Sequence, residues 1–455
     1  MQGPRQSIDL ASSTVEPISL EWDEEWDERE WDERAAAAVG GDHVASREDN
    51  ELMTRSGPGT PAGELLRRYW QPVALSEELP EGGAPLPLKI MGEELVLFRD
   101  ESGQPGLLGL HCAHRGADLS YARLEDGGIR CIYHGWLYDV SGRCLEQPGE
   151  PAGSTFHERI RQTAYPCQER GGAIFAYMGP GDAPLLPNYD FLTAADGYFS
   201  ATKLYSECNY LQALDGGLDP AHVPFLHWNR ERAASDPRSA SDEPALVFAE
   251  ETDYGVRIAM VRHVDTEHNF VGITDYILPN INAFTGTSRD GYSVNWFVPI
   301  DDVTYWKFNL TFTREQPIAR PGRTAMTPGY RPLPNRENRY MQDRAAMPED
   351  SFSGIPANFI QAQDACVCEG AGPIQDRTQE HLATTDRGIV TYRNQFVRAI
   401  KTVMAGDDPP HVIRDSSMNR FDNLIVQSGV VPVTTDWREY CDQATESRRA
   451  AHATA

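Results

Sequence analysis

The sequence has no long run of apolar residues and no excess of positive charge. A membrane-spanning helix needs about 20 consecutive apolar residues, and no such run occurs. The formal net charge is −27, from 68 acidic and 41 basic residues, and a surface of this sign repels nucleic acids and anionic lipids. We therefore expect neither nucleic acid nor a membrane among the partners.

The amino terminus and the cysteines also lack the signs of an exported protein. Residues 1–10 do not have the charged and then apolar pattern of a signal peptide. The eight cysteines are not spaced like those of a small disulfide-bonded domain. A reducing, cytoplasmic location is the expectation. The glycine cluster at Ser56–Gly59 contains a proline, follows no strand and predicts a turn, so no nucleotide-binding loop is expected.

The 455 residues are enough for two or three domains with buried cores. Residues 1–47 include the acidic segment Glu21–Glu33, interrupted by tryptophans, which cannot bury enough apolar surface to fold alone. This part is expected to be a disordered tail, either a docking segment for a basic partner or an extension without a role. Thr60 and Pro61 then predict the start of a short helix reaching Trp70, in a helical segment at 48–71.

Two further segments have different patterns. Residues 72–182 alternate short apolar runs with turn residues and predict a small antiparallel β domain. After a proline-rich boundary at Gly179–Pro187, residues 188–445 combine long strand patterns with helical patterns at 207–227 and about 357–404. The fold class expected is α+β, with helices on one side of an antiparallel sheet. The strands expected are Glu94–Phe98, Leu107–Leu110, Ile129–Ile132, Ala173–Met178, Ile273–Leu278, Tyr292–Pro299 and Tyr305–Phe312.

Two cysteine and histidine pairs lie within the β region. Cys112 and His114 form a C-x-H pair, and Cys131 and His134 form a C-x2-H pair. Two thiolates and two imidazoles can hold a [2Fe–2S] cluster whose histidines replace two cysteines on one iron. They could also hold a structural zinc ion. The flanking Arg-Gly and Gly-Trp are not needed by a zinc module and favour the cluster, with both loops at the tips of paired hairpins.

A second candidate metal site follows at 219–227. Two histidines and one carboxylate on Fe(II) leave coordination positions open for O2 and a substrate. His222 and His227 are five residues apart, and a straight helix would separate them by roughly 140°. The helix must therefore bend or end between them, and Pro224 is the expected break. Asp219, followed by a proline, is typical of a helix N-cap.

These motifs resemble those of a known family. CAHRGADL and CIYHGWLYD resemble the Rieske domain of the Rieske non-heme iron oxygenases, and the segment NYLQALDGGLDPAHVPFLH resembles the mononuclear iron motif of their large oxygenase subunits, in particular the phthalate 4,5-dioxygenase-like group. The resemblance covers about residue 48 to about residue 405. It implies a Rieske [2Fe–2S] domain at 72–182 and a helix-grip (START-like) catalytic domain at 188–445.

The resemblance also implies roles for individual residues. It implies that Asp219 connects a Rieske histidine of one subunit to an iron-binding histidine of the next, and hence a homotrimer. The third iron ligand is a downstream carboxylate, for which Asp364, Glu369, Asp376 and Glu380 are available; the family pattern Q-D-x-x-V-x-E selects Asp364. The ligands implied are Cys112, His114, Cys131 and His134 for the cluster, and His222, His227 and Asp364 for mononuclear Fe(II).

The function implied is that of a terminal oxygenase component. It would use O2, and electrons from a separate NAD(P)H-dependent reductase with flavin and ferredoxin-type centres, to hydroxylate a carboxylated aromatic substrate. A monooxygenase or O-demethylase of a methoxylated aromatic acid is the alternative, and a Rieske electron carrier a further one. Arg230, Arg232 and Arg262 are candidates for binding the carboxylate. Cys366 and Cys368 are expected to be packing residues.

Overall fold

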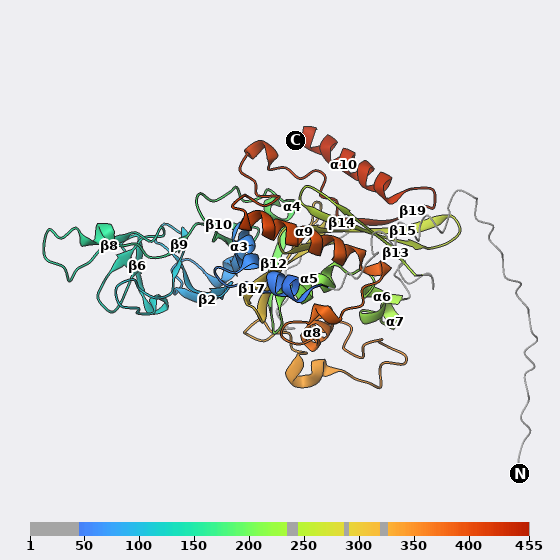
Figure 1. Cartoon of the computed structure of the whole chain (residues 1–455), viewed down its shortest axis with the longest axis horizontal. Helices are drawn as coiled ribbons and strands as arrows, with labels where there is room; N and C mark the ends of the chain where they lie inside the picture. The colour runs from blue at the N-terminus through green and yellow to red at the C-terminus, as the bar shows by residue number, and fades with distance from the viewer. Residues whose placement is uncertain (1–44, 234–243, 286–290, 319–325, 455) are drawn as a thin grey trace, which may run out of the picture. The chain divides into compact units, whose positions relative to one another are not determined.

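The computed structural model describes residues 45–233, 244–285, 291–318 and 326–454 (Figure 1). Of the tail predicted at 1–47, residues 1–44 with the acidic segment lie outside the described residues, and Arg47 is already the first residue of a helix. Among the described residues, no helix is sufficiently long and apolar to span a membrane. The chain begins here with α2 (Arg47–Thr54) and α3 (Pro61–Arg67). Thr60 caps α3 by accepting the N–H of Gly63, as predicted, but the helix ends at Arg67 and Trp70 starts a strand.

The predicted β region forms three small antiparallel sheets. Its strands confirm the four that the sequence predicts there, with ends differing by one or two residues. The first sheet has the strand order β1 (Trp70–Leu75), β11 (Ala173–Tyr177), β10 (Cys167–Arg170). The second sheet has the order β2 (Leu86–Ile90), β3 (Glu93–Arg99), β4 (Pro105–Gly109), β9 (Ala164–Tyr165). The third sheet has the order β5 (Arg123–Glu125), β6 (Gly128–Arg130), β7 (Leu137–Tyr138), β8 (Cys144–Glu146).

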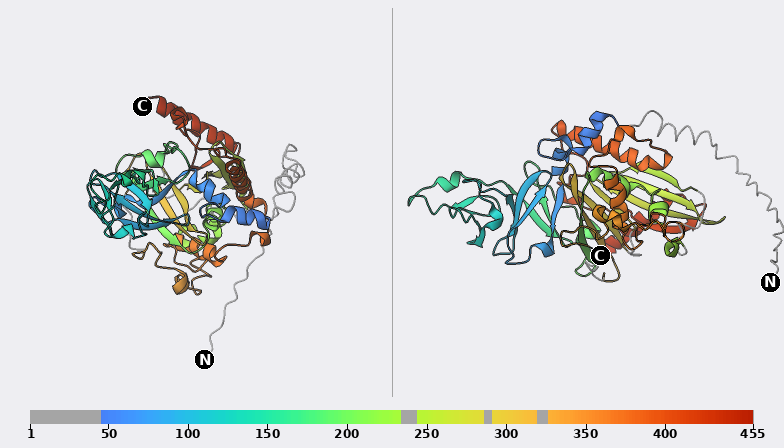
Figure 2. Two further views of the ribbon diagram at one scale, coloured as in Figure 1. Left: turned by 60° about the vertical axis from the view of Figure 1, so that its left-hand side comes forward. Right: turned by 90° about the horizontal axis from the view of Figure 1, so that it is seen from below.

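The second half of the chain is built on one large antiparallel sheet. Its strands run in the order β12-β18-β17-β16-β15-β14-β13, and β19 pairs with β15. The strands predicted in this half are all present within it. Their bounds are β12 (Phe199–Ser206), β13 (Leu246–Glu251), β14 (Gly255–His263), β15 (His268–Ile277), β16 (Ile281–Phe284), β17 (Tyr292–Asp301), β18 (Thr304–Phe312) and β19 (Ser428–Pro432). The two further views show these strands as a group separate from the small sheets (Figure 2).

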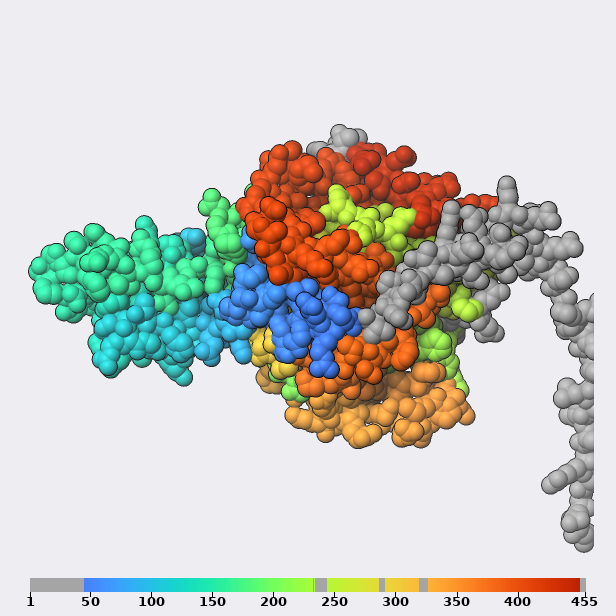
Figure 3. All heavy atoms as spheres, viewed as in Figure 1, coloured from blue at the N-terminus to red at the C-terminus, as the bar shows by residue number. Residues whose placement is uncertain are grey.

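Helices pack against this sheet. α9 (Arg387–Met404) lies on β13 and β14, and α5 (Tyr210–Leu218) lies on β16 and β17. The surface view places α2 and α3 beside α9 (Figure 3). The single helical segment expected at 357–404 is wrong: α8 (Ile360–Gly370) ends before Gly372, whose φ of +97° a helix does not allow. The remaining helices are α4 (Asp190–Thr193), α6 (Val223–Leu226), α7 (Arg230–Ala233) and α10 (Trp437–Thr454).

Backbone and side-chain contacts connect the small sheets to the large one. In the turn between β2 and β3, the N–H of Met91 donates to the carbonyl of Pro299 at 2.7 Å. The Lys203 ammonium lies 2.7 Å from a Glu78 oxygen and 4.3 Å from the ring centroid of Trp306. Burial costs the Lys203 ammonium its hydration and lowers its pKa, which the charge of Glu78 opposes, while the aromatic face adds a cation–π contact. These contacts fix the small sheets against β12, β17 and β18.

Candidate metal centres

The first candidate centre is formed by two loops at the ends of small-sheet strands. Cys112 and Cys131 are only 2% and 3% exposed. Each loop is closed by a glycine N–H that donates to the cysteine carbonyl, Gly116 to Cys112 at 2.8 Å and Gly135 to Cys131 at 2.9 Å. Both glycines have φ above +70°, which side chains disfavour. Burial raises the pKa of the Cys131 thiol, and the neighbouring Cys112 raises it further.

The two histidines of these loops face each other. The ring centroids of His114 and His134 are 4.4 Å apart, and His114 stacks on Trp136 at 4.3 Å with an interplanar angle of 6°. The Nδ1 of His114 is buried and has no hydrogen-bond partner among the described residues. A ring nitrogen without a partner, in a loop that also carries a buried cysteine, fits a metal cluster that takes two cysteines and two histidines. The structure thus brings the four predicted cluster ligands together.

Tyr138 contacts this centre from the core. Its hydroxyl lies 3.2 Å from the Sγ of Cys112, and its ring is fully buried in a cluster with Phe98 and Ile129. Burial raises the pKa of Tyr138, and the hydrogen bond to Cys112 adds to the effect. The hydroxyl therefore keeps its proton and can donate to a cysteine sulfur, a contact that the sequence did not predict.

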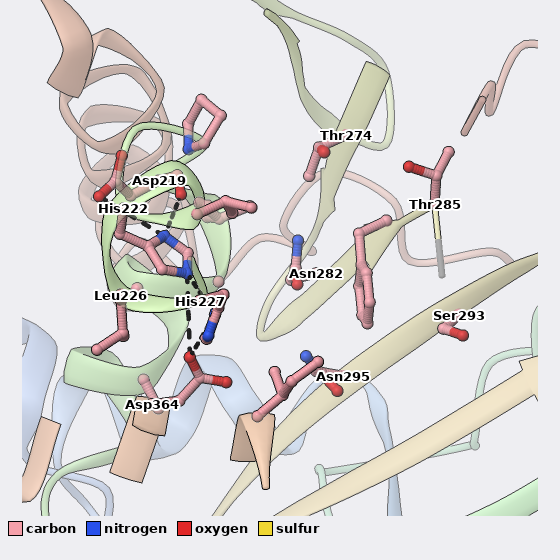
Figure 4. A pocket seen from close by; sticks show the side chains of 18 of the residues that line it. Asp219, His222, Leu226, His227, Thr274, Asn282, Thr285, Ser293, Asn295 and Asp364 are labelled. Atoms are coloured by element: carbon pink, nitrogen blue, oxygen red, sulfur yellow. Dashed lines mark hydrogen bonds and ion pairs between the residues drawn. The ribbon is translucent and has the colours of Figure 1, made fainter. Parts of the chain in front are cut away.

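The second candidate centre comprises His222, His227 and Asp364 (Figure 4). One ligand atom from each lies within 4.8 Å of the others. The two Nε2 atoms are 3.2 Å apart, and the His227 Nε2 is 3.1 Å from an Asp364 oxygen. His222 precedes the one-turn helix α6 and His227 follows it, while Asp364 comes from α8. This is the metal triad expected from the sequence.

The local backbone around the histidines differs from the prediction. α5 ends at Leu218, with Asp219 as its C-cap, and the one-turn helix α6 ends at Leu226, between the two histidines as expected. Pro224 lies in the first turn of α6, where a proline is tolerated. Asp219 does not cap a following helix either: its Oδ1 accepts the N–H of Ala221 at 2.7 Å. Asp-Pro also starts turns of this kind, which explains the error at Asp219; Pro224 is not the break because a proline fits the first turn of a helix.

Each iron-site histidine has its other ring nitrogen engaged. The Nδ1 of His227 lies 2.7 Å from the Oε1 of Gln363, and the Nδ1 of His222 contacts the backbone carbonyl of Asp219. Both Nδ1 atoms therefore act as donors, which leaves both Nε2 atoms as acceptors facing each other. Metal-binding histidines are held in this way. The donor set of two imidazoles and one carboxylate fits a mononuclear iron.

Asp364 has a different partner for each oxygen. Oδ1 faces His227, and Oδ2 lies 3.9 Å from the Nζ of Lys307. Burial alone would raise the pKa of Asp364, but the neighbouring His227 and the Lys307 charge hold it below its usual range. The alternative carboxylates have other roles: Glu369 accepts the N–H of Glu207, Asp376 caps a 3-10 turn, and Glu380 pairs with Arg393.

The triad lies at the wall of a cavity of about 640 Å³. α5, α6 and α8 line one side, and β14 to β18 line the other. Arg262 is among the lining residues, as is Lys307, which the sequence analysis missed because one lysine in a strand pattern carries no signal. Arg230 is exposed, pairs with Glu349 and does not line the cavity. The side chain of Arg232 lies outside the described residues.

The two cysteines of α8 are packing residues, as expected. Cys368 is buried, lines the cavity and donates to the carbonyl of Gln212 at 3.6 Å. Cys366 is half-buried, packs beside the cluster of Tyr340 and Ile355, and belongs to no metal group among the described residues.

Comparisons with known proteins agree with this geometry. Residues 69–164 match the Rieske [2Fe-2S] domain family, and residues 176–454 match the family described as LigXa C-terminal domain like. The oxygenase subunit of 5,5'-dehydrodivanillate O-demethylase from Sphingobium sp. is 34% identical, over 83% of this chain and 85% of the relative. The oxygenase subunit of phthalate 4,5-dioxygenase from Pseudomonas putida is 32% identical, over 86% of this chain and 94% of the relative.

The chain belongs to the Rieske non-heme iron oxygenases. It is an oxygenase subunit of the type found in aromatic ring-hydroxylating systems, an oxidoreductase with a [2Fe–2S] cluster and a mononuclear iron. The terminal oxygenase of carbazole 1,9a-dioxygenase from Novosphingobium sp. KA1 shares its fold, with a TM-score of 0.54 at 18% identity, over 85% of this chain and 99% of that one. The predicted fold class, enzyme class and cofactors are thus confirmed.

Proposed function

We propose that this Rieske oxygenase subunit oxidises a carboxylated aromatic compound, with Fe(II) held by His222, His227 and Asp364. The observation that carries the proposal is the triad's position on a cavity that also contains two cationic side chains, Arg262 and Lys307. Iron bound there supplies the binding and reduction of O2, which protein side chains cannot perform. The chain's own residues would bind and orient the substrate beside it.

The cavity walls suit an aromatic acid. Met260, Phe270 and Phe284 give the lining apolar surface for a ring, and burial of a ring in such a pocket is favourable. Arg262 would take the carboxylate, because a guanidinium presents two parallel N–H donors to its two oxygens. One relative is named for phthalate, an aromatic dicarboxylate, which supports this substrate class.

Electron transfer under this proposal crosses between subunits. Cys112, Cys131, His114 and His134 would hold the cluster. The Asp219 carboxylate lies 3.7 Å from the ring of His222 and is 22% exposed. In the described part of one chain, no contact joins Asp219 to the loops that carry His114 and His134. In a homotrimer, the Rieske loops of one subunit would lie beside Asp219 of the next subunit.

The proposed electron source is a separate NAD(P)H-dependent reductase with flavin and ferredoxin-type centres. Structures with a similar fold include an oxygenase and ferredoxin complex of carbazole 1,9a-dioxygenase, which supports a protein electron donor. A cytoplasmic location belongs to the same proposal, because NAD(P)H is available there.

Single turnover tests the proposal. The purified protein is loaded with Fe(II), its cluster is reduced chemically, and 18O2 is added with a panel of aromatic acids. A labelled product is expected, and mass spectrometry counts the oxygen atoms retained. Two atoms indicate dioxygenation, whereas one atom or release of formaldehyde from a methoxy group indicates monooxygenation or O-demethylation. No product from any acid, with full iron loading confirmed, would contradict the substrate class. If no product forms and the protein binds only the two irons of the cluster, the result would favour a Rieske electron carrier.

The path between subunits has its own test. A His222→Ala chain keeps the cluster ligands, and a Cys131→Ser chain keeps the mononuclear site. Transfer between subunits predicts that trimers containing both chains recover activity that neither variant has alone. Mixed trimers without activity, although each chain retains its remaining metal centre, would place the path within one chain.

A further inference from the structure

Three asparagines lie side by side across the floor of the cavity. Asn282 of β16 is directly opposite Asn295 of β17, which is directly opposite Asn309 of β18. Side chains in such positions point to the same face, with Cβ atoms roughly 5 Å apart. All three line the cavity. We refer to Asn282, Asn295 and Asn309 as the asparagine ladder.

The ladder uses its amide groups unequally. The Nδ2 of Asn309 donates to the Oδ1 of Asn295 at 2.9 Å and to the carbonyl of Val294 at 3.2 Å. These bonds fix the Asn309 amide and the carbonyl end of Asn295. Asn282 is only 1% exposed, and its Nδ2 is buried without an acceptor among the described residues. A buried N–H without a partner costs about 1–3 kcal/mol, so such groups usually have a purpose.

The Asn282 amide packs against α5. A Cβ at Gly217 would come 3.0 Å from the Oδ1 of Asn282 and 3.2 Å from its Cγ, so the bare backbone of Gly217 packs against the oxygen side of the amide. The N–H side is then directed elsewhere. Figure 4 shows Asn282 across the pocket from His222 and His227. A ligand between them would meet the iron site on one side and the amide on the other.

We propose that Asn282 determines specificity by donating a hydrogen bond to an uncharged oxygen on the substrate, an ether, hydroxyl or carbonyl oxygen attached to the ring. This inference rests on the proposed function, in which the cavity binds the substrate. A neutral amide donor matches a neutral acceptor, whereas the carboxylate is the partner of the cationic Arg262. A substrate without that oxygen would leave the buried N–H unpaired, and a site of this kind rejects such analogues strongly.

Binding without turnover tests the assignment. Dissociation constants are measured without O2 for benzoate and its three methoxy isomers, with the Fe(II)-loaded protein. At least one methoxybenzoate is expected to bind the wild type more tightly than benzoate does. In Asn282→Leu, which keeps the side-chain size and removes the donor, this preference should fall about 10- to 100-fold while benzoate binding changes little.

Two further variants make the result specific. Asn282→Asp keeps the side-chain shape and replaces the N–H donor by an acceptor, so it should also lose the preference for a methoxybenzoate over benzoate. This variant provides the test if Asn282→Leu does not fold. Asn269→Leu is the matched control, because Asn269 is a buried asparagine of β15 that does not line the cavity. An unchanged preference in both Asn282 variants, or an equal loss in Asn269→Leu, would overturn the proposal.

The same measurements separate this inference from the proposed function. If neither benzoate nor any methoxybenzoate binds the wild type, the proposal of a carboxylated substrate fails. The binding measurements are then repeated with the uncharged compounds methoxybenzene and toluene. Tighter binding of methoxybenzene, abolished by Asn282→Leu, would uphold the role of Asn282 without the carboxylate. Equal binding of methoxybenzene and toluene by the wild type would reject it.

Discussion

The Oε1 of Gln363 lies 2.7 Å from the Nδ1 of His227, and Asp364, the next residue in α8, lies 3.1 Å from the Nε2 of the same ring. Of two consecutive residues of one helix, Gln363 therefore accepts the Nδ1–H of His227 and Asp364 places its carboxylate beside the Nε2 as a second metal ligand. Gln363 is itself fixed, because its Nε2 donates to the carbonyl of Ile355 at 3.1 Å. This arrangement sets the tautomer in which the Nε2 of His227 is free to bind a metal.

Replacing Gln363 should weaken the mononuclear site without affecting the cluster. In Gln363→Leu the ring of His227 loses the acceptor that orients it, and loss of such a partner typically lowers metal affinity about 10- to 100-fold. Fe(II) titration with a competing chelator measures the affinity, and the visible spectrum reports the cluster. Gln379→Leu, an exposed glutamine outside the site, is the control. Equal affinity in Gln363→Leu and the wild type would show that Asp364 alone positions His227.

Tyr138 should tune the cluster. Its hydroxyl lies 3.2 Å from the Cys112 sulfur, and a hydrogen bond to a cluster sulfur stabilises the reduced, more negative state. Tyr138→Phe should therefore lower the reduction potential by tens of millivolts, since about 1 kcal/mol corresponds to roughly 40 mV for one electron. A redox titration followed by EPR measures it. A potential equal to that of the wild type would mean that the hydroxyl does not donate to the sulfur.

Asp215 should stabilise the helix that leads to Asp219. It lies 2.8 Å from the guanidinium groups of both Arg377 and Arg393, all three side chains being largely buried. Asp215→Asn leaves Arg377 without its counter-charge and Arg393 with Glu380 alone, and should lower the free energy of unfolding by about 3–5 kcal/mol. Asp408→Asn breaks the more exposed pair with Arg414 and should cost less than about 1 kcal/mol. Denaturant unfolding of both variants tests this, and equal effects would contradict it.

His411 should make the fold sensitive to acid. Burial among aromatic side chains lowers its pKa to about 4, although the Asp253 charge opposes the shift, and its Nε2 lies 2.5 Å from the hydroxyl of Tyr189. Between pH 6.5 and about 4 the unfolded chain binds a proton there that the folded chain does not. The free energy of unfolding should therefore fall with decreasing pH, by up to about 1.4 kcal/mol per pH unit from this group.

His411→Asn removes this titration and keeps a polar partner for Tyr189. Asparagine tolerates the φ of +66° found at position 411. Unfolding of the two proteins is compared from pH 7 to pH 4.5. The variant should show the shallower loss of stability, and parallel curves would mean that His411 titrates normally.

The sequence predicted what depends on local patterns and motifs. The strands around the loops of Cys112 and Cys131 and the long strands such as Tyr292–Asp301 follow from alternation and turn residues, whereas the choice of Asp364 among four carboxylates came from the family resemblance. The errors near the iron site occurred at two prolines whose local sequence allows more than one structure: Asp219 and its proline form a turn, and Pro224 lies in the first turn of a helix.

Other features needed the three-dimensional structure, because they depend on strand register or on contacts distant in sequence. Gln363 and His227 are 136 residues apart. The asparagine ladder exists only because β16, β17 and β18 pair in one register, and a shift by one residue would turn Asn295 to the other face. Lys307 and Arg262 reach the same cavity from different strands.

The central claim is that one chain carries two separate metal centres, with Asp364 serving only the second. Iron content and spectra of the wild type and of Asp364→Ala test it most directly. We expect about three irons per chain in the wild type and about two in the variant, from a [2Fe–2S] cluster plus one mononuclear iron. The cluster absorption and EPR signals should be the same in both. Equal iron content in the two proteins, or loss of the cluster signal in Asp364→Ala, would contradict the account.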